Sequence, residues 1–233
     1  MRSLARVMAI LEFVASNTEG ATIAEIAKGV DLHIATASRL VHTLREESML
    51  EQNRAHRYVV GNRVLSLARK GMDQNELVVR ARPYMQRLRD LTGETVSLHV
   101  PYEGLRVCIG EVRSKHLISR ALPPGDVKPV LDTATGEVLL INHTAEELAE
   151  VLAAHHSKED LAVVVRRVAG LREQGWSFVD TWVDGVGALS VPIDSGGRAV
   201  AALTVSGPSS RYTRTQAMVH LPDVQQAARQ LAE

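Results

Sequence analysis

Side chains that can hydrogen bond to DNA bases or phosphates recur between positions 33 and 42. The apolar residues of the same stretch follow a helical period, so the polar ones share the other side of a helix. If this helix enters a major groove, these residues would meet the bases: His33, Ala35, Thr36, Ser38, Arg39 and His42. Arg39 can pair with guanine or with a phosphate. The alternative is an ordinary solvated helix face.

The segments around this stretch predict a helix-turn-helix. Apolar residues at spacings of three and four predict a first helix over 4–17. Thr22 and Glu25 have the spacing of a capping box, which would start a short second helix. A tight turn at 29–31 then leads into a third helix over 34–46. Three short helices with a sharp turn before the last are typical of a helix-turn-helix.

A short hairpin is predicted directly after the third helix. Residues 49–52 and 57–60 have strand character and flank a polar tip at 53–56. Such a hairpin beside a recognition helix is a wing, and its Arg54 and Arg57 would lie along phosphates or in the minor groove. Arginines at a turn are otherwise ordinary surface residues.

A helical linker follows, over 61–91. A short helix is expected over 61–71 and a longer one over 76–91, with a hinge at 71–75 between them. Pro83 would kink the longer helix or mark its start. The arginines of this helix either pack on a partner subunit or are solvated, and the sequence favours neither.

The remaining residues, 92–233, predict a second domain. The expected elements, in chain order, are strands at 95–100 and 105–111, helices at 134–142, 145–154 and 160–173, strands at 176–180, 188–193 and 200–205, and a helix at 213–231. This order indicates an α+β domain in which helices pack against an antiparallel sheet.

Composition restricts the class of protein. The chain of 233 residues has a formal net charge of zero, but residues 1–91 carry 14 Lys/Arg against 10 Asp/Glu. The excess of positive charge in this part supports a DNA-binding role there, although residues 1–60 alone are neutral. One cysteine forms no internal disulfide, and neither a signal peptide, a membrane span nor a zinc-ligand cluster is recognised. We expect a cytoplasmic protein without metal or cofactor.

An enzyme acting on a small metabolite, with an appended DNA-binding domain, is the main alternative. Cys108 and the histidines at 143, 155 and 156 are scattered, with no arrangement of nucleophile, base and orienting group. The glycines at 185–187 lack the strand-turn-helix context of a dinucleotide loop. We therefore expect no catalysis. A protein-interaction module without DNA is a third possibility, and it would lack salt-dependent DNA binding.

Four stretches together resemble the IclR family of transcription regulators. They are TASRL at 36–40, YVVG at 58–61, DGVGALSVPI at 184–193 and AALTVSGP at 201–208. The resemblance implies a winged helix-turn-helix domain over 1–60, the linker over 61–91 and a GAF-like effector-binding domain over 92–233. It also implies homodimers or homotetramers on near-palindromic double-stranded operator DNA. The implied function is repression of a catabolic operon, controlled by a small-molecule effector such as an organic or aromatic acid.

The resemblance also implies where the effector binds. The site would lie between the sheet and a helix start, and its residues are Ala134, Thr135, Gly136, Asp180, Val186, Ala188, Thr204 and Ser206. Backbone N–H groups at the helix start and strand hydroxyls would bond a carboxylate. Without the resemblance, Thr204 and Ser206 would be taken for ordinary strand residues on the solvent face.

The chain departs from the family pattern in this region. Leu131 and Glu137 stand where the family commonly has a histidine and a lysine, and Asp132 replaces a small residue. Two carboxylates would repel a dicarboxylate, which favours a hydroxyl-rich, aromatic or partly cationic effector. Three aromatic residues close together either floor an aromatic pocket or pack in the core: Trp176, Phe178 and Trp182.

Overall fold

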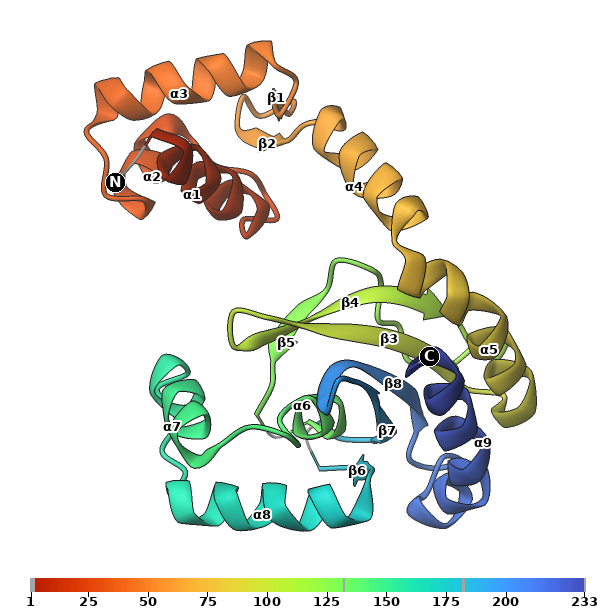
Figure 1. Cartoon of the computed structure of the whole chain (residues 1–233). Coiled ribbons are helices and arrows are strands. Elements are labelled where there is room, and N and C mark those ends of the chain that lie inside the picture. The colour runs from red at the N-terminus through yellow and green to blue at the C-terminus, as the bar shows by residue number, and fades with distance from the viewer. Residues whose placement is uncertain (1–2, 132, 182, 233) are drawn as a thin grey trace. The chain divides into compact units, whose positions relative to one another are not determined.

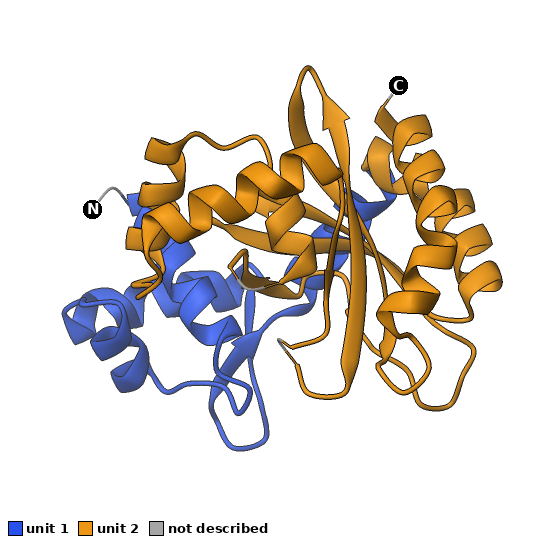
Figure 2. Cartoon of the chain, turned by 90° about the horizontal axis from the view of Figure 1, so that it is seen from below, with its two compact units in different colours: residues 1–74 blue, residues 75–233 orange. Residues whose placement is uncertain are grey.

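The computed structural model describes residues 3–131, 133–181 and 183–232. The chain forms two compact units, Met1–Gln74 and Asn75–Glu233, which Figure 2 shows in blue and orange. The division falls inside the segment expected as a linker. Among the described residues, no helix is both long and apolar enough to cross a membrane.

The first unit is the expected three-helix domain with a wing. Its elements are α1 Ser3–Ala15, α2 Ile23–Gly29, α3 Ile34–Glu46, β1 Leu50–Gln52, β2 Tyr58–Val60 and α4 Asn62–Gln74 (Figure 1). Apolar faces of the first three helices and the wing close over a core that includes Ile10, Ile26, Val41, Leu50 and Tyr58. The predicted helix-turn-helix and hairpin are thus confirmed.

Local hydrogen bonds set the ends of these elements. The predicted capping box is present: the Glu25 amide donates to Thr22 Oγ1 at 3.3 Å and the Thr22 amide donates to Glu25 Oε2 at 2.8 Å. At the tip of the wing, Asn53 Oδ1 accepts the amides of Ala55 and Arg57, both at 3.0 Å. The Asn53 side chain thus accepts hydrogen bonds from turn amides that have no backbone acceptor within reach. This allows the hairpin to reverse direction within a few residues.

The linker differs from the prediction at its hinge. Helix α4 continues through Gly71 to Gln74, and α5 starts at Glu76, so the break between the helices is narrower than the expected hinge at 71–75 and lies at its last residue, Asn75. Only Asn75 separates the helices, where its Oδ1 accepts the Val78 amide at 3.1 Å as an N-cap. A single glycine in a helix costs only about 1 kcal/mol relative to alanine, and this cost is too small to end α4 at Gly71.

The second unit is an α+β domain built on a six-stranded antiparallel sheet, with the order β5-β4-β3-β8-β7-β6. Its elements are α5 Glu76–Thr92, β3 Thr95–Tyr102, β4 Leu105–Val112, β5 Val127–Pro129, α6 Ala134–Leu139, α7 Ala145–Ala154, α8 Leu161–Gln174, β6 Ser177–Val179, β7 Val186–Ser195, β8 Arg198–Pro208 and α9 Arg214–Ala232. Pro83 lies inside α5, so that helix does not begin there. The edge strand β5 was not predicted, because three residues are too few to show alternation.

The two faces of the sheet differ in chemistry. One face, with residues such as Leu98, Leu189 and Leu203, packs against α5 and α9 and forms the main apolar core. Figure 1 shows these two helices side by side over the strands. The other face is covered by α6, where Val138 and Leu139 pack against Ala202. Since side chains alternate between faces, the buried residues facing α6 are the intervening ones, and many of them are polar.

Helix α6 is held close to the preceding chain by a glycine. A Cβ added to Gly136 would lie 1.8 Å from the Val130 carbonyl oxygen. Only a residue without a side chain allows this approach.

We therefore predict that Gly136→Ala destabilises the second unit by about 3 kcal/mol, because the added methyl must displace backbone. Gly170→Ala in α8 is the matched control, since nothing lies within 4 Å of its added Cβ. It should stabilise the protein by about 0.5–1 kcal/mol through helix propensity. Urea unfolding followed by tryptophan fluorescence measures both, because both tryptophans lie in residues 75–233. Equal stabilities of the two variants would contradict the close packing.

Candidate functional site

The structure displays most of the predicted DNA-reading residues on the surface of the first unit. His33, Ala35, Arg39 and His42 are exposed on α3, whereas Thr36 and Ser38 are half-buried. The His33 ring has a second role as the N-cap of α3, because its Nδ1 accepts the Ala35 amide at 3.4 Å.

The two arginines of the wing have different environments. Arg54 is exposed at the tip. Arg57 is half-buried, bonds Glu25 Oε2 at 2.7 Å and donates from Nε to the Gly20 carbonyl at 3.0 Å. Arg57 thereby fastens the wing to the start of α2, so its guanidinium is already engaged within the unit.

The second unit contains a cavity of about 40 Å³ between the sheet and the start of α6. It is lined by Arg106, Arg120, Leu122, Thr133, Ala134, Thr135, Val179, Val183, Val186, Ala188, Thr204 and Ser206. The structure therefore brings together six of the eight residues expected to bind an effector.

Gly136 and Asp180 do not line the cavity. Asp180 is exposed after β6, and Gly136 packs against Val130. The Gly136 amide already donates to Thr133 Oγ1 at 3.0 Å, so it is not available as the expected carboxylate donor. Sequence position placed both residues near the site but gave no information on which way they face.

Three hydroxyl groups form a buried cluster behind the cavity. Thr204 Oγ1 lies 2.6 Å from Ser190 Oγ and 3.0 Å from Thr135 Oγ1. Thr204 and Ser206 are 1% and 2% exposed, which rules out the solvent-face interpretation. Ser206 Oγ, also buried, has no hydrogen-bond partner among the described residues. Because an unmet buried hydroxyl is costly, this atom marks a position where a ligand or water would be bound.

Two arginines that the sequence analysis missed give the cavity a positive wall. Arg106 on β4 is 3% exposed, and Arg120 comes from the loop after β4. Burial lowers the pKa of Arg106 to about 10, so the guanidinium stays charged at neutral pH. The sequence signal for Arg106 was an arginine between the apolar residues Leu105 and Val107.

Arg106 is bonded to a buried histidine on the neighbouring strand. Its Nη1 lies 3.1 Å from His99 Nδ1, and His99 Nε2 lies 2.9 Å from Ser97 Oγ. Burial, followed by the nearby Arg106 charge, lowers the pKa of His99 to about 3. The imidazole is therefore neutral at physiological pH.

Glu137 was expected to repel a dicarboxylate effector, but its position does not support this. Its carboxylate accepts a bond from Ser177 and lies 3.5 Å from Arg167 Nε, and it does not line the cavity. The negative charge is thus directed towards β6 and α8. Asp132 lies outside the described residues, and Leu131 is buried in the core beside α7 and α8.

Of the two interpretations of the aromatic residues, packing in the core is the one that Phe178 confirms. Phe178 is part of the main core, on the face of the sheet that packs against α5 and α9. The Trp176 ring stacks with the Arg214 guanidinium, 5.3 Å from its centroid. Neither lines the cavity, because Phe178 faces away from α6 and Trp176, which precedes β6, packs against the same core. Trp182 lies outside the described residues.

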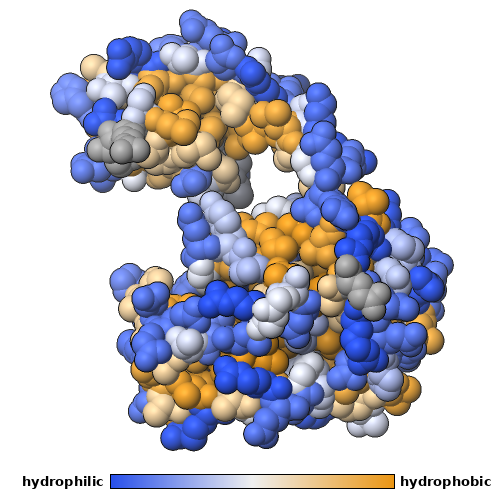
Figure 3. All heavy atoms as spheres, viewed as in Figure 1, coloured by the Kyte–Doolittle hydropathy of each residue, from blue (hydrophilic) through white to orange (hydrophobic). Residues whose placement is uncertain are grey.

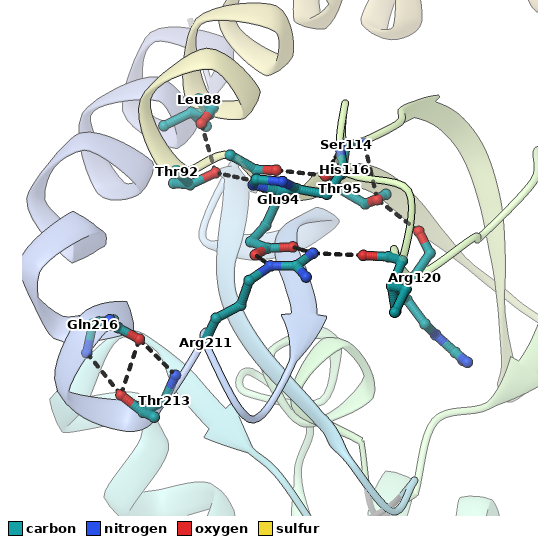
Figure 4. A network of polar contacts seen from close by, with 12 residues as sticks. Leu88, Thr92, Glu94, Thr95, Ser114, His116, Arg120, Arg211, Thr213 and Gln216 are labelled. Carbon is teal, nitrogen blue, oxygen red and sulfur yellow. Dashed lines mark hydrogen bonds and ion pairs between the residues drawn. The ribbon is translucent and has the colours of Figure 1, made fainter.

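The loop that carries Arg120 is fixed by a polar network, shown in Figure 4. Thr95 Oγ1 donates to the Arg120 carbonyl at 2.6 Å. Arg211 pairs with the buried Glu94, with Nη2 3.0 Å from Oε2, and donates to the Ile118 carbonyl at 2.7 Å. Glu94 directly follows the C-cap of α5 at Gly93. The cavity loop is therefore tied to the end of α5.

Cys108 and His155, which were considered for catalysis, are engaged in contacts that hold the fold together. Cys108 is buried, which raises the pKa of its thiol to about 12, and its Sγ donates to the Leu122 carbonyl at 3.0 Å. His155 Nε2 lies 2.6 Å from the Gly104 carbonyl oxygen. Within the described part of the chain, no group of three or more His, Cys, Asp or Glu residues is arranged to hold a metal ion.

Comparison with known proteins supplies a family for both units. Residues 70–233 match the model of the bacterial transcriptional regulator IclR C-terminal domain, and residues 3–54 match the IclR helix-turn-helix domain. The HTH-type transcriptional repressor AllR of Salmonella paratyphi A is 26% identical, over 91% of this chain and 82% of that protein. The HTH-type transcriptional regulator BhcR of Paracoccus denitrificans is 26% identical, over 100% of this chain and 86% of that protein.

Solved structures share the fold. The IclR regulator of Alicyclobacillus acidocaldarius has a TM-score of 0.84 at 20% identity and covers 99% of this chain and 97% of its own. An IclR homologue of Microbacterium hydrocarbonoxydans, solved with 4-hydroxybenzoate, has a TM-score of 0.79 at 22% identity and covers 98% and 97%.

The lowered pKa of His99 predicts a pH dependence of stability. Between the unfolded pKa of about 6.5 and the folded value of about 3, unfolding takes up one proton at this residue. Its contribution to stability is therefore complete above pH 6.5 and is lost as the pH falls, by about 1.4 kcal/mol per pH unit. Urea unfolding of the wild type and His99→Gln between pH 4.5 and 7.5 measures it. The variant should lose stability less steeply, and identical slopes would contradict a neutral buried His99.

Proposed function

This chain belongs to the IclR family of bacterial transcription regulators, and from that premise we propose that it represses a catabolic operon and is released by a small organic acid. Members of the family are transcription factors and not enzymes. We propose a cytoplasmic location, because a repressor works where the bacterial chromosome lies.

The positive wall of the cavity is the observation that supports an acidic effector. Arg106 and Arg120 both line it, and arginine suits carboxylates in charge and geometry. The unpartnered hydroxyl of Ser206 lines the same space and would donate a further hydrogen bond to the ligand. The hydroxyls of Thr135 and Thr204 complete a polar rear wall.

The size of the cavity favours a ligand of few atoms. A cavity of roughly 150 Å³ is known to bind benzene, whereas this one measures about 40 Å³. A short carboxylic acid therefore requires less movement of the walls than an aromatic acid. An aromatic acid is the second candidate, supported by the 4-hydroxybenzoate in the homologue from Microbacterium hydrocarbonoxydans.

A homodimer or homotetramer is the assembly that we propose. None of the residues of α4 is buried, and its Leu65 and Leu67 are 60% and 54% exposed. Leu4 and Met8 on α1 are 72% and 47% exposed. Figure 3 shows apolar residues gathered on the viewed face of the first unit. A second copy that covers these residues would also supply the second recognition helix needed to read a palindrome.

DNA binding is tested by fluorescence anisotropy with the chain's own upstream DNA and a scrambled duplex, at two salt concentrations. The wild type should prefer its own DNA, with an affinity that falls steeply with salt and with two or four chains per duplex. Arg39→Ala should weaken specific binding about tenfold or more, because it removes a base or phosphate contact. Arg166→Ala, an exposed charge on α8, is the control and should bind as the wild type does. Equal binding to both duplexes would reject the regulator.

Effector binding is tested by calorimetry with carboxylic acids of increasing size, from acetate to 4-hydroxybenzoate. Ser206→Ala should weaken the bound acid about tenfold, since hydrogen bonds to charged groups contribute about 1.5–3 kcal/mol. Its hydroxyl has no partner in the described structure, so the fold should be unaffected, whereas Thr204→Val would disturb three hydroxyls at once. Ser210→Ala, an exposed serine outside the cavity, is the control. Unchanged affinity in Ser206→Ala would place the effector elsewhere.

A further inference from the structure

We propose that His99 is a positioning residue that holds the Arg106 guanidinium in the cavity wall and so makes the effector site selective for anions. The inference rests on the proposed function, because it concerns the same cavity. It assigns a role to a buried residue that does not itself line the cavity.

The hydrogen bonds define the state of His99. An arginine can only donate, so the 3.1 Å contact from Arg106 Nη1 requires His99 Nδ1 to accept. The ring proton must then be on Nε2, which donates to Ser97 Oγ at 2.9 Å. One neutral tautomer satisfies both contacts. The lowered pKa of His99 agrees with it, because a protonated ring would direct a second N–H at the guanidinium.

A β-bulge places Arg106 on the same face of the sheet as His99. The register of β3 and β4 shifts between Leu98, which pairs with Gly110, and His99, which pairs with Cys108. Without this one-residue shift, Arg106 would pair with Tyr102 and face the apolar core under α5. With the shift it pairs with Pro101, two residues from His99, on the polar face. Bulges often redirect a side chain beside a functional site in this way.

A neutral acceptor suits an anion site better than a carboxylate would. An aspartate in place of His99 would orient Arg106 equally well, but it would neutralise the charge that an effector must find. His99 fixes one N–H of the Arg106 guanidinium. Because the imidazole is neutral, this contact does not cancel the positive charge of Arg106. An arginine side chain has many rotamers, so fixing it in advance lowers the entropy lost when the ligand binds. Ser97 is opposite Thr204 in the sheet, which anchors this arrangement next to the cavity hydroxyls.

The test compares acids with their neutral amides. Pyruvate with pyruvamide, and benzoate with benzamide, are titrated calorimetrically into the full-length wild type, His99→Leu and His99→Gln. The wild type should prefer the acid of at least one pair. His99→Leu should reduce that preference about tenfold or more, whereas His99→Gln should remain within about threefold, because its amide can accept from Arg106 and donate to Ser97. A folded His99→Leu protein with the wild-type preference would overturn the inference.

Two further measurements separate the possible failures. Arg106→Gln should abolish the preference for the acid. If it does and His99→Leu does not, only the role of His99 fails. If Arg106→Gln retains the preference, the roles of Arg106 and His99 both fail although the effector is still an acid. If the wild type shows no preference, the acidic effector fails as well. The second measurement is the ¹⁵N chemical shifts of the His99 ring, which report its tautomer in the wild-type protein without any substitution. They should show a neutral ring protonated at Nε2 at pH 7, and a ring protonated at Nδ1 or at both nitrogens would overturn the inference.

Discussion

The burial of a positive charge at Arg106 is the constraint around which the second unit is arranged. Moving a guanidinium out of water costs several kcal/mol unless polar groups replace the water. Here a neutral histidine accepts one of its bonds, and the charge of Asp126 opposes the effect of burial. A charge held in this partly compensated state attracts a small anion more strongly than an exposed arginine does, because solvent screens it less.

The division of the sheet into an apolar and a polar face makes such a site possible. The core under α5 and α9 contains the large apolar side chains of five strands and supplies most of the burial. The opposite face therefore need not be apolar, and it carries Ser97, His99, Ser190 and Thr204 with almost no exposure. Stability and recognition thus depend on alternate residues of the same strands, so changes to one face need not disturb the other.

Most of the elements could be predicted from the sequence because their signals are local. Apolar periods mark α1 and α3, and the capping box of Thr22 and Glu25 marks α2. The continuation of α4 through Gly71 and the role of Arg106 could not be predicted in this way. Whether Gly71 ends a helix depends on its surroundings, and the face that Arg106 occupies depends on a bulge of one residue. The same limit explains Glu137 and Phe178, whose positions in the chain were close to the site although their side chains point away from it.

The loop after β4 connects the cavity with α5, and in the proposed regulator it would transmit the effect of ligand binding towards the helix-turn-helix unit. This loop carries Arg120 at the cavity, and at its other end Lys115 pairs with Asp90 on α5 at 3.0 Å. Arg89, also on α5, donates to the Arg113 carbonyl at 3.2 Å. An anion that draws Arg120 inward would therefore change the contacts at the C-terminal end of α5. The N-terminal end of the same helix is separated from α4 by Asn75 alone, so α5 itself would have to transmit the change. In the proposed regulator, the effector needs to bind only one of two positions of this loop more tightly in order to shift the balance between DNA-bound and released states.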